Sequence, residues 1–201
     1  MIAKRMEQLR YPVLPIRDSI LYPQLMMPFT VGRPASIAAV EAALASEERT
    51  LLVVTQKDPS AEEIGREDLF DVGVMAVIKK AEKHEDMWHL IVHGKQRVEL
   101  DAVVESEPYL SVEARPVPDP QDDDQQIDAL HREVLALTAR VSDVLEPQTP
   151  IPLVRVVSQQ KDALQQAYLL ASLLGLDTER GLPLLAARSR KEALQLTHEF
   201  L

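Results

Sequence analysis

A proline-rich, acidic stretch at residues 116–126 divides the chain into two parts of different character. Pro116, Pro118 and Pro120 fall within five residues, and proline suits neither a helix interior nor a central strand because its nitrogen carries no hydrogen. Aspartates follow, and negative charge suits the start of a helix, where the macrodipole is positive. We therefore expect two domains, at residues 1–117 and 118–201, joined by a linker that runs into a helix.

Before the linker, apolar and polar residues mostly alternate, which is the pattern of strands with one buried face. Within 72–81, Val72, Val74, Ala76 and Ile78 share one face. The run 50–56 has an uninterrupted apolar centre, which is typical of a fully buried strand. Further short strands are expected at 13–16 (bounded by Pro12 and broken by Pro15), 27–31, 87–93, 96–100 and 109–114.

Three local features complete this first part. Polar residues at 83–86 predict a hairpin connection, and Gly94 interrupts the following strand, which indicates a bulge or a tight bend. One helix begins at Pro34, because proline suits the first turn, and it carries an apolar face of Ile37, Val40 and Leu44. We expect a compact, mostly antiparallel β barrel or open sheet with one helix.

After the linker the apolar spacing becomes helical. Residues from Ile127 to Val144 step by three and four and form a heptad-like seam of Ile127, Leu130, Val134, Leu137, Val141 and Val144. The prolines within 147–152 are expected to end this helix. A second helix has its apolar face within 164–174 and is expected to end at Gly175, which suits a C-terminal cap.

Two shorter helices are expected to follow. One begins after Asp177, and Gly181 and Pro183 leave its limits open. Ser189 and Glu192 have the spacing of a capping box, in which each side chain accepts a hydrogen bond from the other residue's amide. The helix that they open carries apolar residues towards Leu201 without a stop signal, so we expect a chain cut inside a helix. The fold class is α+β, with a β domain followed by an α-helical bundle.

Composition excludes several kinds of site. The 201 residues contain no cysteine, which excludes disulfides, thiolate nucleophiles and cysteine-ligated metals. The six glycines lack the spacing of a phosphate-binding or dinucleotide-binding loop, and no serine lies in a GxSxG elbow. We therefore expect no enzyme activity and no cofactor for these residues.

Charge and hydropathy exclude two classes of partner. The net charge is −10 and is spread over both parts, whereas nucleic-acid binding needs a basic surface. The longest runs without a charged residue have 14 residues, fewer than the roughly 20 that span a bilayer. Charged residues near the N-terminus leave no apolar signal-peptide core. We expect a cytoplasmic protein without nucleic-acid or membrane partners.

The histidines and paired carboxylates do not have the spacing or burial that a metal site or a catalytic site needs. His89 and His93 would lie roughly 13 Å apart on a strand that rises about 3.3 Å per residue, too far for one zinc ion. The carboxylate pairs at 62–63 and 67–68 lie in a loop, and nothing predicts the burial that would shift a catalytic pKa. We interpret them as solvated loop residues and expect no metal site.

A dense apolar segment around Met26 is the best candidate for binding other proteins. Methionine is flexible and polarisable, and it recurs on surfaces that bind varied partners. Packing in the core is the favoured interpretation both of this segment and of the single tryptophan. The candidate protein-binding residues, chosen by apolar density, are Leu25, Met26, Met27, Phe29 and Trp88.

Six short segments of the first part match one known family in order. They are LPIRD at 14–18, LYP at 21–23, VGRPASI at 31–37, QKDP at 56–59, DLFDVGV at 68–74 and VHGKQRV at 92–98. This pattern resembles the N-terminal domain of Lon, the ATP-dependent serine protease, over about residues 11–116. The helical part follows in the right place with weaker similarity.

The resemblance implies a PUA-like β domain followed by a helical bundle. In the family this region helps to recognise unfolded or damaged protein substrates and supports assembly of a hexamer. An ATPase module and a Ser/Lys protease domain follow it there. Neither set of motifs occurs in these residues, so no catalytic residue and no ATP or magnesium site carries over.

Three other functions stay open at this point. The chain could act as a stand-alone adaptor of the same fold, without a protease. It could be an RNA-binding PUA-like domain, against which its negative charge counts. It could also be an enzyme, for which we find no constellation of catalytic residues.

Overall fold

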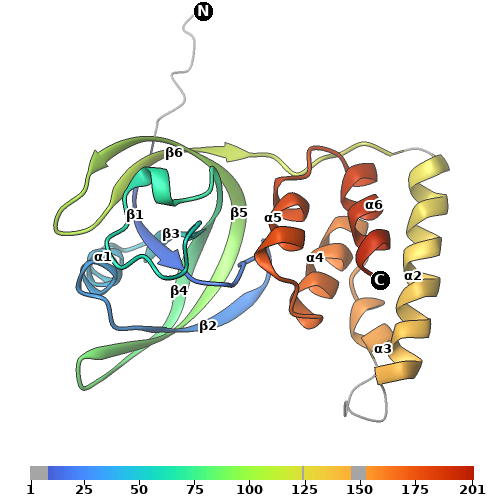
Figure 1. Ribbon diagram of the computed structural model, residues 1–201, viewed down its shortest axis with the longest axis horizontal. Helices are drawn as coiled ribbons and strands as arrows, with labels where there is room; N and C mark the ends of the chain where they lie inside the picture. The colour runs from blue at the N-terminus through green and yellow to red at the C-terminus, as the bar shows by residue number, and fades with distance from the viewer. Residues whose placement is uncertain (1–8, 124, 146–152) are drawn as a thin grey trace, which may run out of the picture. The chain divides into compact units, whose positions relative to one another are not determined.

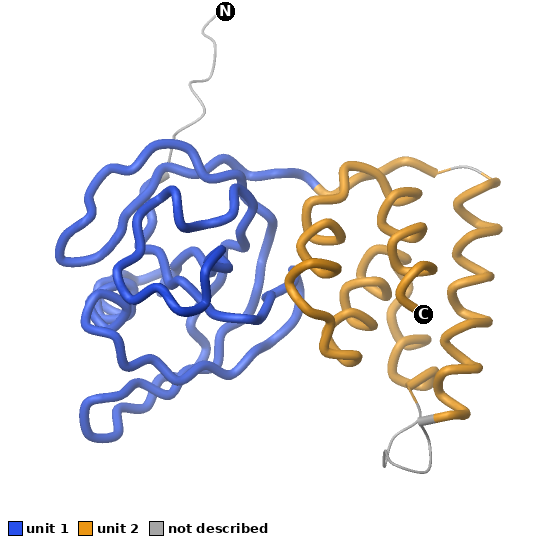
Figure 2. The backbone as a smooth tube through the Cα atoms, in the orientation of Figure 1, with its two compact units in different colours: residues 1–118 blue, residues 119–201 orange. Residues whose placement is uncertain are grey.

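The computed structural model describes residues 9–123, 125–145 and 153–201, in two compact units. Unit 1 comprises residues 1–118 and unit 2 residues 119–201 (Figures 1 and 2). The boundary lies within the proline-rich stretch. Within the described residues, no helix is both long and apolar enough to cross a membrane.

Unit 1 is a six-stranded, mostly antiparallel sheet with one helix, as expected. Its strands are β1 (Leu9–Ile16), β2 (Met26–Val31), β3 (Thr50–Thr55), β4 (Val72–His84), β5 (Met87–Glu105) and β6 (Ser111–Val117). Their order is β2-β5-β4-β3-β1-β6, and β5 pairs with β6 as well. This additional pairing closes five strands into a barrel, with β2 attached to the first half of β5 (Figure 1). The pair β1–β3 is parallel.

The prolines of β1 do not break the strand, contrary to expectation. β1 pairs with β6 over Leu9–Pro12 and with β3 from Val13 onward. Each half of the strand therefore has a ladder neighbour on one side, which leaves a free side for a nitrogen without a hydrogen. β6 likewise continues through Pro116 to Val117, beyond the expected end at residue 114.

The helix of unit 1, α1 (Pro34–Ala45), begins at the predicted proline. Its buried face consists of small residues and one valine: Ser36, Ala39, Val40 and Ala43. Ile37 and Leu44, which were expected on that face, are only half-buried. Small side chains allow the helix to pack closely on β1 and β3. The buried face of the helix is therefore the one with small residues, and not the one with Ile37 and Leu44.

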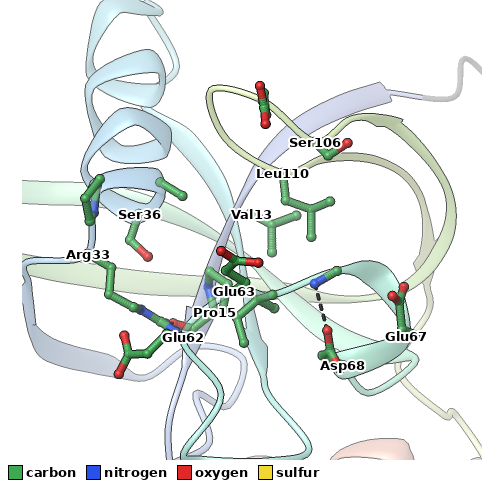
Figure 3. A pocket seen from close by; sticks show the side chains of 15 residues that line it. Val13, Pro15, Arg33, Ser36, Glu62, Glu63, Glu67, Asp68, Ser106 and Leu110 are labelled. Atoms are coloured by element: carbon green, nitrogen blue, oxygen red, sulfur yellow. Dashed lines mark hydrogen bonds between the residues drawn. The ribbon is translucent and has the colours of Figure 1, made fainter.

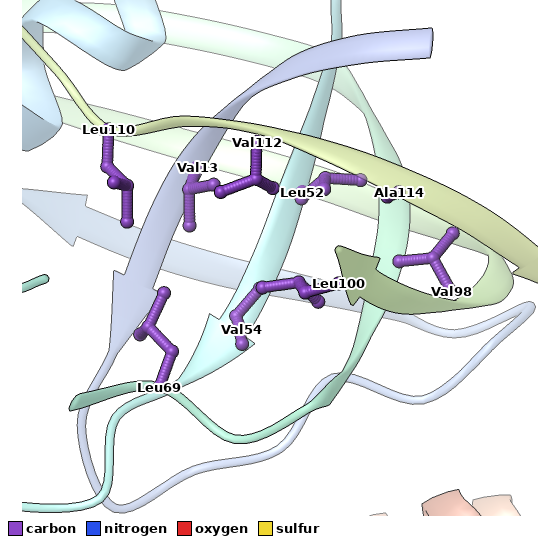
Figure 4. Packing of buried hydrophobic residues seen from close by; sticks show 9 residues of the cluster. All are labelled: Val13, Leu52, Val54, Leu69, Val98, Leu100, Leu110, Val112 and Ala114. Atoms are coloured by element: carbon purple, nitrogen blue, oxygen red, sulfur yellow. The ribbon is translucent and has the colours of Figure 1, made fainter. Parts of the chain in front are cut away.

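One cluster of the barrel core draws on four strands and two loops. Nine residues, at most 6% exposed, pack together (Figure 4): Val13, Leu52, Val54, Leu69, Val98, Leu100, Leu110, Val112 and Ala114. The predicted interruption at Gly94 is a bulge, because the register shifts between the pairs Ala76–Gly94 and Met75–Gln96. A Cβ at Gly94 would lie 2.5 Å from the Tyr22 carbonyl oxygen, so this close approach requires glycine.

Unit 2 is a helical bundle of α2 (Gln125–Leu145), α3 (Leu153–Val157), α4 (Ala163–Leu173), α5 (Thr178–Ala186) and α6 (Arg190–Phe200). Ile127 and Val134 of the predicted seam are buried. Thereafter the buried stripe passes through Thr138 and Ser142, and Val144 is 74% exposed. The seam was wrong in its second half because a helix of 3.6 residues per turn drifts away from a 3.5-residue repeat. The sequence did not predict α3, and the prolines of 147–152 lie outside the described residues.

The helix ends of unit 2 follow the sequence signals closely. Gly175 has a φ of 62°, and the amide of Leu176 donates to the Ala171 carbonyl, as in a Schellman cap. Asp177 caps α5 by accepting from the Arg180 amide at 2.9 Å. The helix continues through Gly181 and Pro183.

The start of α6 corrects two expectations. Ser189 accepts from the Glu192 amide at 3.0 Å, but Glu192 accepts from the Arg188 amide rather than completing the box at Ser189. The linker carboxylate of Asp122 also serves this helix, because its oxygens accept from the amides of Arg190 at 2.7 Å and Lys191 at 3.3 Å. This linker aspartate therefore caps a helix far along the chain, and not the helix that follows it.

Candidate functional site

A cavity of about 800 Å³ opens in unit 1 between β1, the first turn of α1 and two loops. The loop after β3 contributes residues 62–65, 67 and 68, and it includes a short 3₁₀ helix, Arg66–Asp68. The loop between β5 and β6 contributes Ser106, Glu107 and Leu110. Figure 3 shows Arg33 and Ser36 on the helix side and Glu67 and Asp68 on the opposite side.

The floor of this cavity is apolar. Val13 and Leu110, 1% and 6% exposed, belong to the barrel core, and half-buried Ile64 packs against that core. Pro15, Pro34 and Ala35 add to the apolar lining. An apolar concave surface of this size can enclose an apolar side chain from a ligand and remove it from water.

Arg33 and Gln56 hold the wall of the cavity in place. The Arg33 guanidinium donates to the Gln56 side-chain oxygen at 2.9 Å and to the Pro15 carbonyl at 2.7 Å. Gln56 is buried and donates to the carbonyls of Asp58 and Ala61. Burial lowers the pKa of Arg33, and the neighbouring Arg17 lowers it further. These bonds attach the loop after β3 to β1 and to the start of α1.

The rim of the cavity is acidic. Glu62 forms an ion pair with Arg17 at 2.8 Å, and Asp68 accepts from the Gly65 amide at 2.8 Å (dashed line in Figure 3). Glu63, Glu67 and Glu107 are exposed, and no described residue forms an ion pair with them. The carboxylates of 62–63 and 67 are thus solvated, as the sequence indicated, but they also border a cavity.

The five predicted binding residues do not share one surface. In β2 the side chains alternate, so half-buried Met27 and Phe29 lie on the face opposite to Met26, which is 61% exposed. Trp88 pairs with Val31, at an inward position of β2, and is half-buried. Leu25 precedes β2 and is half-buried. The pleat therefore separates Met26 from the others.

Phe29 lines a second cavity of about 450 Å³. This cavity and the larger one share Pro15, Arg33 and Ser36. The two cavities therefore form neighbouring depressions on either side of the Arg33 side chain. Of the predicted residues, Phe29 is the one that this arrangement places beside the larger cavity.

The side chain of Trp88 contacts residues of α1 and β4 within unit 1. Its Nε1 donates to a Glu41 carboxylate oxygen of α1 at 3.4 Å, and the Lys83 ammonium lies 5.5 Å from the ring centroid. Lys83 also hydrogen-bonds Glu41 and is the main cause of the lowered pKa of that carboxyl group. Trp88 thus ties the β4–β5 hairpin to α1, which supports the packing interpretation.

Sequence reasoning missed the cavity because its lining comes from separate segments. Arg33, Glu63 and Glu107 are brought together by the closed barrel and not by sequence spacing. One feature of the sequence could have pointed to this region: Arg33 and Gln56 lie inside the segments that carry the family resemblance. Across the described part of the chain, no three His, Asp or Glu side chains gather as metal ligands.

The chain matches one known protein family over nearly its whole length. The sequence profile of the ATP-dependent protease La (LON) substrate-binding domain matches residues 10–201. A Lon protease from Nitrosococcus oceani is 41% identical over 196 residues, covering 98% of this chain and 25% of that protein. A Lon protease from Escherichia coli strain K12 is 36% identical over 137 residues, covering 68% of this chain and 17% of that protein.

Two solved structures share the fold. The N-terminal domain of a Mycobacterium avium complex Lon protease superposes with a TM-score of 0.74 at 24% identity, covering 96% of this chain and 97% of that one. A Lon N-terminal domain protein from Xanthomonas campestris gives a TM-score of 0.64 at 17% identity, covering 96% and 99%. The chain spans about a quarter or less of the length of the Nitrosococcus oceani and Escherichia coli Lon proteases. It belongs to the Lon substrate-binding domain family.

Proposed function

We propose that this chain is the substrate-recognition module of a Lon-type ATP-dependent protease and that it captures unfolded or damaged proteins. The observation that carries the proposal is the apolar-floored cavity of about 800 Å³ on a member of the substrate-binding domain family. We place the protein in the cytoplasm. On its own, the chain is expected to hydrolyse neither ATP nor peptide bonds.

The proposed selectivity follows from what unfolding exposes. A folded protein buries most large apolar side chains, whereas an unfolded segment presents them in an extended chain. Transfer of one such side chain from water into an apolar site stabilises binding by roughly 1.5–3 kcal/mol. A single domain therefore binds weakly and releases readily, which suits a module that samples many sequences.

Assembly would convert this weak binding into retention. Family members with the same domain are expected to form a hexamer, and linked copies raise the effective concentration of each remaining site by up to the millimolar range. A client with several apolar segments could then engage several copies. Support for assembly is part of the proposed role of this region.

Within unit 1, we propose that a client segment lies across the two neighbouring cavities. Pro15, Arg33 and Ser36 border both cavities, and Phe29 borders the smaller one. An extended chain places alternate side chains on one face at a spacing of about 6.6 Å, so successive apolar residues can enter neighbouring depressions. Leu25, Met26, Met27 and Trp88 remain a prediction as client contacts.

The direct test is titration of the 201-residue chain with a fluorescently labelled, permanently unfolded protein and with its folded form. We expect micromolar to millimolar binding of the unfolded form and much weaker binding of the folded one. Equal affinity for both forms would contradict the proposal.

A matched pair of variants locates the surface. Phe29→Ser and Met26→Ser make changes on opposite faces of the same strand. We expect Phe29→Ser to weaken client binding more than Met26→Ser does, with circular dichroism confirming that both variants fold. The reverse order would place the clients on the outer face of β2.

A further inference from the structure

We infer that the larger cavity selects apolar client segments that are flanked by lysine or arginine. This inference rests on the proposed function and names the class of segment that the site takes. Its basis is the combination of an apolar floor with a rim of like charge. An apolar floor alone would accept any unfolded segment, whereas the rim adds a charge requirement.

The charges around the opening are strongly unbalanced. The lining residues carry five carboxylates, of Glu62, Glu63, Glu67, Asp68 and Glu107, and one guanidinium, of Arg33. Arg33 is directed into the protein, where Gln56 and the Pro15 carbonyl accept its hydrogen bonds. It therefore holds the wall and does not neutralise the rim.

Three of the carboxylates are available to a ligand. Glu62 is paired with Arg17, and Asp68 is occupied with the Gly65 amide. Glu63, Glu67 and Glu107 are exposed without an ion-pair partner among the described residues, and they come from two different loops. A bound segment would therefore meet negative charge from more than one direction.

Lysine and arginine fit this combination better than other residues. Their aliphatic stems can lie along apolar surface while the charged head stays in water. Here the stem would contact the floor near Ile64, and the head would reach the rim. An acidic flank would instead bring like charges together within the Debye length of about 8 Å at physiological salt, which disfavours binding.

The same residues disfavour other ligands. A metal ion is not indicated, because among the described residues no group of three potential ligands gathers. A phosphate or nucleic acid would meet the rim carboxylates, although the first turn of α1 lies at the cavity. A polypeptide with apolar and cationic side chains satisfies both the floor and the rim.

The test uses three disordered peptides with one identical apolar centre and the same label. Their flanks carry four lysines, four glutamines or four glutamates. Binding to the 201-residue chain is measured by fluorescence anisotropy at low and at high salt. We expect the lysine peptide to bind about fivefold more tightly than the glutamine peptide at low salt, from several exposed charge pairs of modest individual strength, and the glutamate peptide to bind most weakly. High salt should reduce these differences.

A matched pair of triple variants separates the rim from the overall charge of the protein. E63Q/E67Q/E107Q removes three charges at the cavity, and E47Q/E48Q/E85Q removes three exposed charges of unit 1 that do not line it. We expect the first variant to lose the preference for lysine flanks while it still binds the glutamine peptide. The control variant should retain the preference.

The outcomes are distinguishable. Equal binding of all three peptides by the natural chain would overturn the charge requirement and leave the proposed function standing. Loss of the preference in both triple variants alike would assign it to net charge and would also overturn the inference. Failure of every peptide to bind, together with equal affinity for folded and unfolded protein, would contradict the proposed function itself.

Discussion

The two units are held together in different ways. In unit 1 several ladders join segments that are far apart in the sequence, since β1 pairs with β3 and β6, and β2 pairs with β5. In unit 2 many stabilising hydrogen bonds join residues that are close in the sequence. The buried side chains of Thr138 and Thr197, for example, donate to carbonyls of their own helices. The helix ends there depend on short-range caps and on Asp122.

This difference explains where a binding cavity can form. A site made of loops needs a rigid scaffold beneath it. The closed barrel supplies that scaffold, and Arg33 and Gln56 attach the loop after β3 to it. Changes in the barrel should therefore have larger effects than changes in the caps of unit 2, and five predictions can break or sharpen this comparison.

The largest effect is expected from Leu52→Ala in the barrel core. Leu52 is fully buried in the cluster of nine residues, and truncating a buried leucine destabilises by about 2–5 kcal/mol through lost burial and a residual cavity. Amide hydrogen exchange in β3 and β4 would report the loss. Val103→Ala, at a position that is 41% exposed, is the control and should change stability much less. Equal effects of the two changes would contradict this description of the core.

A pair of glycine substitutions compares the units directly. Gly94→Ala would place a Cβ 2.5 Å from a backbone oxygen, and we expect a loss of about 2 kcal/mol from this overpacking. Gly175→Ala meets no atom within 4 Å but keeps a φ of +62°, which costs roughly 1 kcal/mol in a left-handed conformation. Thermal unfolding measures both. A larger loss at Gly175 would reverse the expected order.

Removal of the linker cap should have a smaller effect, confined to α6. Asp122→Ala leaves the amides of Arg190 and Lys191 without their carboxylate, and loss of such a cap destabilises by about 1 kcal/mol. Asp122→Asn keeps an acceptor and should retain part of this. Hydrogen exchange of α6 amides measures the change.

The same cap should depend on pH in a defined direction. The hydrogen bond from the Arg190 amide is the main cause that lowers the pKa of Asp122 in the folded chain. Its stabilisation is therefore present above the pKa of the unfolded chain and is lost as the pH falls through the folded-state value. If the protection of the α6 amides from hydrogen exchange did not fall in acid, the charge of the Asp122 carboxylate would not contribute to the stability of this helix end.

The smallest effect is expected at His93. Burial, followed by the charges of Lys95 and Lys79, lowers the pKa of this imidazole. Because the unfolded chain binds the proton more readily, unit 1 should lose some stability as the pH falls below the ordinary histidine value of about 6.5. Thermal melts between pH 7.5 and 5 should show this loss in the natural chain and less of it in His93→Gln. An identical loss in both would assign the pH dependence to other groups.

Much of the fold could be predicted from the sequence because local signals agreed with the tertiary structure. The alternation around Val74, the buried run of β3 and the caps at Gly175 and Asp177 all appear as expected. The predictions that were wrong concerned features that depend on tertiary packing. The two halves of β1 have different neighbours, so its prolines are tolerated, and close packing buries the small face of α1.

The candidate site was less predictable for the same physical reason. Apolar density led to β2, where the pleat puts Met26 and Phe29 on opposite faces. The larger cavity exists because barrel closure brings the β5–β6 loop near the loop after β3. The acidic residues were recognisable as solvated loop residues, but their common border could not be derived from spacing.

The central claim is that unit 1 binds unfolded segments at the cavity beside Arg33. The most direct measurement is an NMR titration of the isotope-labelled 201-residue chain with the unfolded client protein. We predict saturable shifts of the amides near Ser36, Ile64 and Leu110, and none with the folded form of the client. Shifts confined to the helices of unit 2, or no shifts at concentrations where the client binds, would contradict the claim.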